Sequence, residues 1–182
     1  MALNVNYYPV PPAGRVVVVS DTTLTVATQI LTVAVPAAVA ASGYFRLGFK
    51  HVATQSTTSF LLINGATTNI DMYGVQQTNG STGAGAMVTL NNPDMYIQPY
   101  DAGTVSGQVE VYGVVGDYRI IRASYSEIPA SGTPVYHVVT WQGAWKDKTN
   151  AITSIGFNST AAGDINVGTH VTLSYNQGGP SI

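Results

Sequence analysis

The chain contains no cysteine and very little charge. Of its 182 residues only 9% are Asp, Glu, Lys or Arg, whereas about 25% is typical of globular proteins. Without cysteine there is neither a disulfide framework nor a thiolate metal site, so cysteine usage does not indicate a redox compartment. Thr, Ser, Asn, Gln, Gly and Ala take the place of the missing charges. A surface of that kind offers little self-repulsion, which favours a protein that works inside an assembly.

The few charges also lack the patterns of nucleic-acid and membrane proteins. The formal net charge is −2 and the Lys and Arg residues are scattered, so no basic stripe can neutralise phosphates. The longest apolar run, residues 30–41, is too short to span a membrane and contains Pro36. The first residues lack the basic and apolar regions of a secretion signal. We therefore expect a soluble protein that binds neither nucleic acid nor membrane by itself.

Motifs for catalysis and metal binding are missing as well. Asp71 and Glu110 are carboxylates on predicted strands that could face each other as in a glycosidase, but no motif supports the pair. The glycine-rich loop at residues 80–85 is not followed by the Lys-Ser/Thr of a P-loop, and Gly-x-Ser-x-Gly is absent. We predict no enzyme, no metal and no cofactor, and a glycan depolymerase is the least favoured alternative. The histidines lie in separate predicted strands without the close spacing of zinc ligands: His51, His137 and His170.

The sequence does contain many short β-type segments separated by turn signals. In residues 44–51 the alternation places Phe45, Leu47 and Phe49 on one face, toward a core. No segment has the rhythm of a long amphipathic helix, although Ala37–Ala41 allows one helical turn. Turn signals roughly every 8 to 12 residues are typical of a sandwich or barrel. We therefore predict an all-β fold.

Local patterns make the prediction more specific. Strands are expected to begin at Arg15, and the continuous run Val16–Val19 favours a strand covered on both faces. Asn64-Gly65 is a strong hairpin signal after an apolar strand. Residues 151–157 and 169–175 alternate in polarity around a loop of small residues. We interpret these two last segments as a C-terminal hairpin.

The first 22 residues are predicted to form an extended N-terminal arm and first turn, before a sandwich domain at residues 23–176 and a flexible tail at residues 177–182. Three closely spaced prolines forbid helix and remove sheet donors, which leaves an extended, polyproline-like segment. One interpretation is a loosely attached terminus. The other is an arm that lies on a neighbouring subunit, with tyrosines as anchors. Its interface residues are then Asn4, Tyr7, Tyr8, Pro9, Val10, Pro11 and Pro12.

Trp141 and Trp145 flank a short turn beside the charged residues 146–148. A pair of tryptophans next to a loop could stack on sugar rings. The alternative interpretation is that one indole belongs to the core and the other packs against the base of the loop, since large aromatic side chains are usually mostly buried.

Several short motifs, in this order along the chain, resemble a known family. They are Phe45-Arg-Leu-Gly-Phe49, Leu62-Ile-Asn-Gly65, Tyr73, the turn before Trp145, Ala151-Ile-Thr-Ser-Ile155, Gly163, Gly168-Thr169 and Val171-x-Leu173-x-Tyr175. The set is similar to the small β-sandwich structural proteins of tailed bacteriophages, and the resemblance covers roughly residues 25–175. One departure is the ending Leu173-Ser-Tyr-Asn176, where that family has Leu-Tyr-Gly.

The resemblance implies a jelly-roll-like antiparallel β-sandwich that is made in the host cytoplasm and located on the virion, on the head or in a tail or fibre. Our leading hypothesis is a capsid decoration (cement) protein, a homotrimer on the outside of the head. It would bind the major capsid protein and stabilise contacts between its subunits. The alternative is a tail or fibre domain that binds host-surface glycans through Trp141 and Trp145. Fold alone does not choose between them.

Overall fold

The computed structural model describes residues 15–54, 58–79, 85–90, 95–97, 103–129 and 136–177. Almost all of its regular structure is β-strand, with the single turn of helix α1 at Ala37–Ala40. The strands are β1 (Arg15–Thr23), β2 (Ile30–Ala34), β3 (Tyr44–Val52), β4 (Ser59–Ile63), β5 (Ile70–Asn79), β6 (Gly85–Leu90), β7 (Tyr96–Ile97), β8 (Gly103–Tyr112), β9 (Arg119–Pro129), β10 (Tyr136–Trp145), β11 (Ser154–Ser159) and β12 (His170–Gln177).

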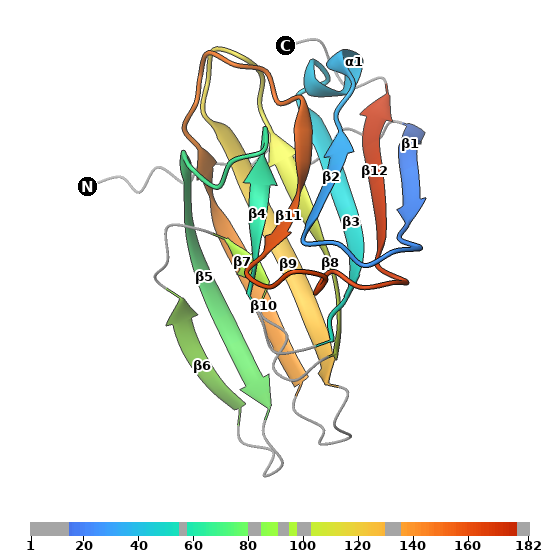
Figure 1. Cartoon of the computed structure of the whole chain (residues 1–182). Helices are drawn as coiled ribbons and strands as arrows, with labels where there is room; N and C mark the ends of the chain where they lie inside the picture. The colour runs from blue at the N-terminus through green and yellow to red at the C-terminus, as the bar shows by residue number, and fades with distance from the viewer. Residues whose placement is uncertain are drawn as a thin grey trace, which may run out of the picture.

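The strands form two antiparallel sheets that pack face to face (Figure 1). The larger sheet has the order β1-β12-β3-β8-β9-β10-β5-β6, and the smaller sheet has the order β2-β11-β4-β7. In Figure 1 the smaller sheet lies in front, and β5 and β6 extend the larger sheet to the lower left. The predicted all-β sandwich is confirmed.

The strand order is that of a jelly roll with two insertions. β1 pairs with β12, β2 with β11, β3 with β8 and β4 with β7, so the two halves of the chain form one long hairpin. The lateral pairs β12–β3 and β11–β4 roll this hairpin into two sheets. The hairpin β5–β6 is inserted between β4 and β7, and β9–β10 between β8 and β11. Both insertions join the larger sheet beyond β8.

The hydrophobic core lies between the sheets and follows the alternation of the strands. Phe45, Leu47 and Phe49 of β3 are buried, as predicted. The Phe49 ring meets Phe157 of the opposite sheet edge-on, with 5.0 Å between ring centroids. Burying a side chain of this size contributes about 1.5–3 kcal/mol to stability. Other fully buried core side chains are Val109, Ile121, Trp141, Ile155, Ile165 and Leu173.

The predicted C-terminal hairpin is wrong. β11 pairs with β2 and β4 in the smaller sheet, whereas β12 pairs with β1 and β3 in the larger one. The connection at residues 160–169 therefore crosses from sheet to sheet, and Ile165 at its centre is fully buried. Alternation identifies the inward face of each strand, but it carries no information about the partner strand.

The structure also corrects the prediction for Val16–Val19. Val16 and Val18 are 55% and 57% exposed, because both point to the outer face of the larger sheet, opposite to Val17, whose cross-strand partner Tyr175 packs against the core. A register shift between Val18 and Ser20 further interrupts its pairing. A continuous β-branched run thus marks a strand here, but not one covered on both faces.

The Asn64-Gly65 signal forms its turn but not the expected hairpin. Both residues have positive φ, 54° and 77°, and Ile63 and Ala66 exchange two backbone hydrogen bonds across them. β4 and β5 nevertheless belong to different sheets. The Asn64 carboxamide instead accepts a 2.7 Å hydrogen bond from the Thr153 backbone N–H, which joins the turn to the chain before β11.

The boundary between arm and sandwich differs from the prediction. β1 begins at Arg15, as the β-branched run predicts, so residues 15–22 belong to the larger sheet and not to an arm. Gln177 likewise closes β12. Residues 1–14 and 178–182 lie outside the described residues.

Candidate functional site

The two sets of predicted binding residues are the N-terminal arm and the tryptophan pair. The arm residues from Asn4 to Pro12 lie outside the described part of the chain. Trp141 and Trp145 are buried, with 0% and 3% exposure. Both face inward because alternate residues of β10 point into the sandwich. The Trp141 indole meets the Tyr96 ring at 5.0 Å, and the Arg119 guanidinium stacks 4.3 Å from the Trp145 ring centroid. Neither indole is available to stack on a sugar from solvent.

The two strand-borne carboxylates do not form a pair. Asp71 lies on β5 and Glu110 on β8, with β9 and β10 between them. Three strand spacings separate such positions by roughly 14 Å, which exceeds the spacing of glycosidase carboxylates. Asp71 instead forms an ion pair with Lys146 at 3.5 Å.

His51 belongs to a buried polar cluster at the end of β3. Its Nε2 lies 3.2 Å from the Ser59 hydroxyl, and Ser159 donates a 2.9 Å hydrogen bond to the Asp164 carboxylate nearby in the fold. Burial lowers the pKa of His51 from 6.5 to about 4, and the Asp164 charge opposes this shift. The imidazole is therefore neutral at neutral pH. All these side chains are at most 1% exposed, so the cluster is structural.

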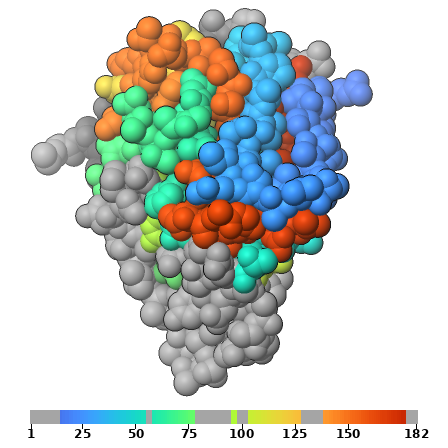
Figure 2. Space-filling view, viewed as in Figure 1, coloured from blue at the N-terminus to red at the C-terminus, as the bar shows by residue number. Residues whose placement is uncertain are grey.

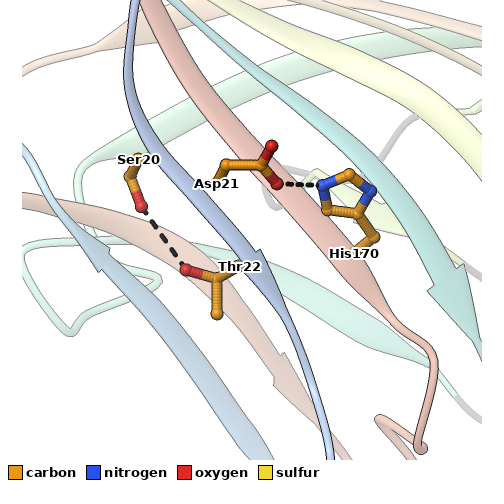
Figure 3. A network of polar contacts seen from close by, with 4 residues as sticks. All are labelled: Ser20, Asp21, Thr22 and His170. Carbon is orange, nitrogen blue, oxygen red and sulfur yellow. Dashed lines mark hydrogen bonds and ion pairs between the residues drawn. The ribbon is translucent and has the colours of Figure 1, made fainter.

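His170 lies on the opposite face of its sheet from the core. Its imidazole contacts the Asp21 carboxylate of the neighbouring strand β1 (Figure 3). In the same view the hydroxyls of Ser20 and Thr22 lie 3.5 Å apart. The contact between His170 and Asp21 joins the edge strand β1 to β12. The side chain of His137 is outside what the structure describes.

The most organised surface group lies on the outer face of the larger sheet, and we call it the Glu110 cluster. Arg46, Glu110 and Arg122 are direct cross-strand neighbours on β3, β8 and β9. The hydroxyls of Tyr44 and Tyr112 donate hydrogen bonds of 3.0 and 3.1 Å to the two oxygens of Glu110. Burial first, and the Glu110 carboxylate second, raise the pKa of both tyrosines above 10.0. These five side chains are all half-buried.

A hollow of about 150 Å³ adjoins the Glu110 cluster. It forms because the next row across the sheet carries short side chains, with Gly48, Ser124 and Thr140 in register with Gln108. The longer Glu110 and Arg122 side chains border it. The lining residues are Gln108, Glu110, Arg122, Ala123, Ser124 and Thr140.

A second depression, of about 320 Å³, lies at the α1 end of the sandwich. Its lining contains no charged residue, and Val115 on its rim is 53% exposed. Arg15, where the described chain begins, is at the same end, as Figure 1 shows for the start of β1. The lining residues are Val35, Ala37, Ala40, Ala41, Val114, Val115, Ala151, Ile152 and Thr153.

Among the described residues, the face formed by the smaller sheet exposes no charged side chain. Segments 24–43, 58–69 and 151–169 build β2, β4, β11 and their connections, and their single charged residue, Asp164, is fully buried. Val26, Ile30 and Val167, which we call the aliphatic patch, are 73%, 54% and 52% exposed. Loop residues 24–28 and 165–168 are joined by backbone hydrogen bonds, and Figure 2 shows these blue and red segments side by side.

The sequence predicts some features of these surfaces and not others. The uncharged stretches can be read directly from the sequence, but nothing in it indicates that they share one face. The sequence does not indicate the Glu110 cluster, because the members of the cluster come from three strands whose pairing the sequence does not reveal.

Comparison of the chain with protein-family models and with curated proteins finds no match. In the described part of the chain, no group of three or more His, Cys, Asp or Glu side chains could hold a metal ion. No helix among the described residues is long and apolar enough to cross a membrane.

Proposed function

We propose that this chain is a capsid decoration (cement) protein of a tailed bacteriophage, which binds the outside of the head and stabilises contacts between major capsid subunits. The observation that carries the proposal is the difference in charge between the two outer faces of the sandwich. The larger sheet presents the charged side chains Asp21, Arg46, Lys50, Asp71, Glu110 and Arg122 to the outside. The described segments of the smaller sheet expose none.

An uncharged face with exposed aliphatic side chains suits a protein partner better than it suits solvent. Protein interfaces are depleted in charge at their centres. The aliphatic patch supplies apolar area, and the surrounding Thr, Ser and Asn residues supply hydrogen-bonding groups. We propose that the face of the smaller sheet lies on the major capsid protein and that the charged outer face of the larger sheet faces solvent.

The fold and the motif order are compatible with this function. Double-sheet jelly rolls recur in viral capsid and lectin domains. The motifs that resemble phage structural proteins lie on β3, β4, β5, β10, β11 and β12 and their connections. Fold alone does not establish function, so the proposal depends on the surface as well.

Binding to the shell would be multivalent. We propose a homotrimer whose N-terminal arms, residues Asn4 to Pro12, add contact area on neighbouring subunits. Linked weak contacts gain affinity through effective concentration, without any one contact being strong. A symmetric assembly of this kind needs no catalytic residue and no cofactor.

The test is binding of purified protein to heads assembled without it. Val167→Asp places a charge in the aliphatic patch and is expected to lower the bound amount at least about tenfold, because burying an unpaired charge is costly. Sedimentation and quantification of the bound band measure the change. Val138→Asp is the matched control, because Val138 is equally exposed (51%) but lies on the outer face of the larger sheet. Equal binding of the two variants would refute the orientation proposed here.

A tail or fibre domain that binds host-surface glycans is the second candidate. The tryptophans do not support it, since both are buried. The observation that favours it is the polar hollow beside the Glu110 cluster.

A further inference from the structure

We propose that the hollow over β8, β9 and β10 is a binding site for an acidic saccharide, held by Arg122, Glu110 and the hydroxyls of Ser124 and Thr140. The inference is independent of the capsid proposal, because it concerns the opposite face of the molecule. A head protein and a tail protein could each carry such a site.

The shape of the hollow suits one sugar ring. Its volume of about 150 Å³ is smaller than a typical drug-sized pocket. Its floor is formed by short side chains on central strands, where Ser124 pairs with Gln108 on one side and Thr140 on the other. The hollow is therefore open to solvent and shallow. It can accommodate one sugar unit of a longer saccharide that continues across the sheet.

The lining offers hydrogen-bond donors and acceptors together, which a polyhydroxylated ligand requires. Gln108 has both an amide N–H₂ and a carbonyl, and Ser124 and Thr140 have hydroxyls that can donate or accept. Glu110 accepts, and Arg122 donates from a planar fork. The Tyr112 ring, with the Arg122 guanidinium 5.8 Å from its centroid, provides an aromatic surface at the edge.

The charges around the hollow favour an acidic ligand. Glu110 stands between Arg46 and Arg122, so the row carries two positive charges and one negative charge. Asp71 and Lys146, farther along the same face, form an ion pair and offset each other. Arg122 hydrogen-bonds the Tyr112 side chain, and its guanidinium has further N–H groups that can donate to a carboxylate on the sugar. A neutral sugar would not gain this contact.

The site is also preorganised. Its residues stand on central strands of the larger sheet and not on loops. The two tyrosine hydroxyls hold both oxygens of Glu110 in place. Sites on rigid elements with supported side chains lose little entropy on binding.

The experiment is an NMR titration of the ¹⁵N-labelled protein with sodium glucuronate, with glucose and sodium acetate as separate controls. We expect chemical-shift changes confined to β8, β9 and β10 and a Kd on the order of 1 mM, as is usual for a single small ligand. Glucose is expected to bind at least about tenfold more weakly. Absence of shifts at about 50 mM glucuronate, well above that Kd, would overturn the proposal. Equal shifts with glucose or acetate would also overturn it.

Variants locate the site. Ser124→Leu and Thr140→Leu each fill the hollow and are expected to abolish the chemical-shift changes caused by glucuronate. One variant that folds is enough for this test. Arg122→Lys keeps the charge but loses the fork, so it is expected to raise the Kd about tenfold. Lys146→Gln is the control, because it removes a cation from outside the hollow and is expected to leave the Kd unchanged. Unchanged glucuronate binding by a variant with a filled hollow would refute this location. Binding of the same variant to heads is a separate measurement that tests the capsid proposal.

Discussion

At the scale of single residues, the sandwich buries polar groups whose protonation depends on the fold. His51 is fully buried, and its Nε2 lies 3.2 Å from the Ser59 hydroxyl. Its pKa is lowered from 6.5 to about 4 by burial. The unfolded chain therefore binds a proton at a higher pH than the folded chain does. The stabilisation is present above pH 6.5 and is lost as the pH falls toward 4.

The first prediction concerns this histidine. Between pH 7 and pH 4 the free energy of unfolding should decrease by about 3 kcal/mol on account of His51, measured by urea denaturation at a series of pH values. His51→Gln keeps a hydrogen-bonding side chain but no titration in this window, so its pH dependence should be shallower. His170→Gln, which removes a histidine from the outer face, should retain the steep dependence that His51 causes. Equal slopes for the wild type and His51→Gln would contradict the account.

At the scale of elements, close approach between neighbouring strands depends on glycine at a few positions. Gly156 lies on β11, which pairs with β2 on one side and β4 on the other. A Cβ atom at this position would lie 1.9 Å from the backbone oxygen of Leu31 on β2. The β2 backbone would have to move to admit any larger side chain, and the smaller sheet has few strands to absorb the change.

The second prediction follows from this contact. Gly156→Ala should destabilise the fold by about 2 kcal/mol or more, because overpacking against a backbone forces strand displacement. Chemical denaturation measures the loss. Thr32→Ala is the control, since Thr32 is the exposed cross-strand neighbour of Gly156, and it should cost less than about 1 kcal/mol. A Gly156→Ala protein as stable as the Thr32→Ala protein would show that the sheet adapts without cost.

Elements are also where prediction from sequence reaches its limit. The alternation at Phe45, Leu47 and Phe49 identified the inward face of β3, because side-chain direction is a local property. Pairing is not local, so alternation alone predicts a hairpin of β11 and β12, although the two strands lie in different sheets. The sequence likewise does not decide whether Trp141 is buried, because its packing partner Tyr96 lies on a strand that is distant in the sequence.

The same limit applies to the surfaces. Glu110, Arg122 and Thr140 are separated in the sequence and meet only because β8, β9 and β10 pair in one register. The scarcity of charge could be read from composition alone. The unequal distribution of the charged residues between the two faces could not be read from composition, because it depends on which segments form the smaller sheet.

At the scale of the whole molecule, the sandwich is a two-faced body with its described chain beginning at one end. The face of the smaller sheet, on which no described residue exposes a charge, and the aliphatic patch suit a protein surface. The larger sheet carries the charged residues and the hollow. β1 starts at Arg15, at the same end of the sandwich as α1 and the apolar depression. Residues 1–14 precede it in the sequence and lie outside the described part of the chain.

The third prediction concerns those residues. Deletion of residues 1–12 should abolish binding to heads and leave the fold intact, because the deletion removes proposed contact area but no described strand. Sedimentation with heads measures binding, and the urea midpoint measures the fold. Unchanged binding by the truncated protein would remove the arm from the account, whatever the result for the aliphatic patch.

The decoration role is tested by the copy number of this protein in purified native particles, quantified against the major capsid protein. We expect a number comparable with that of the major capsid protein, because the protein would decorate the whole head. A handful of copies per particle would contradict the decoration role and favour the tail or fibre. Complete absence from particles would contradict the virion assignment itself.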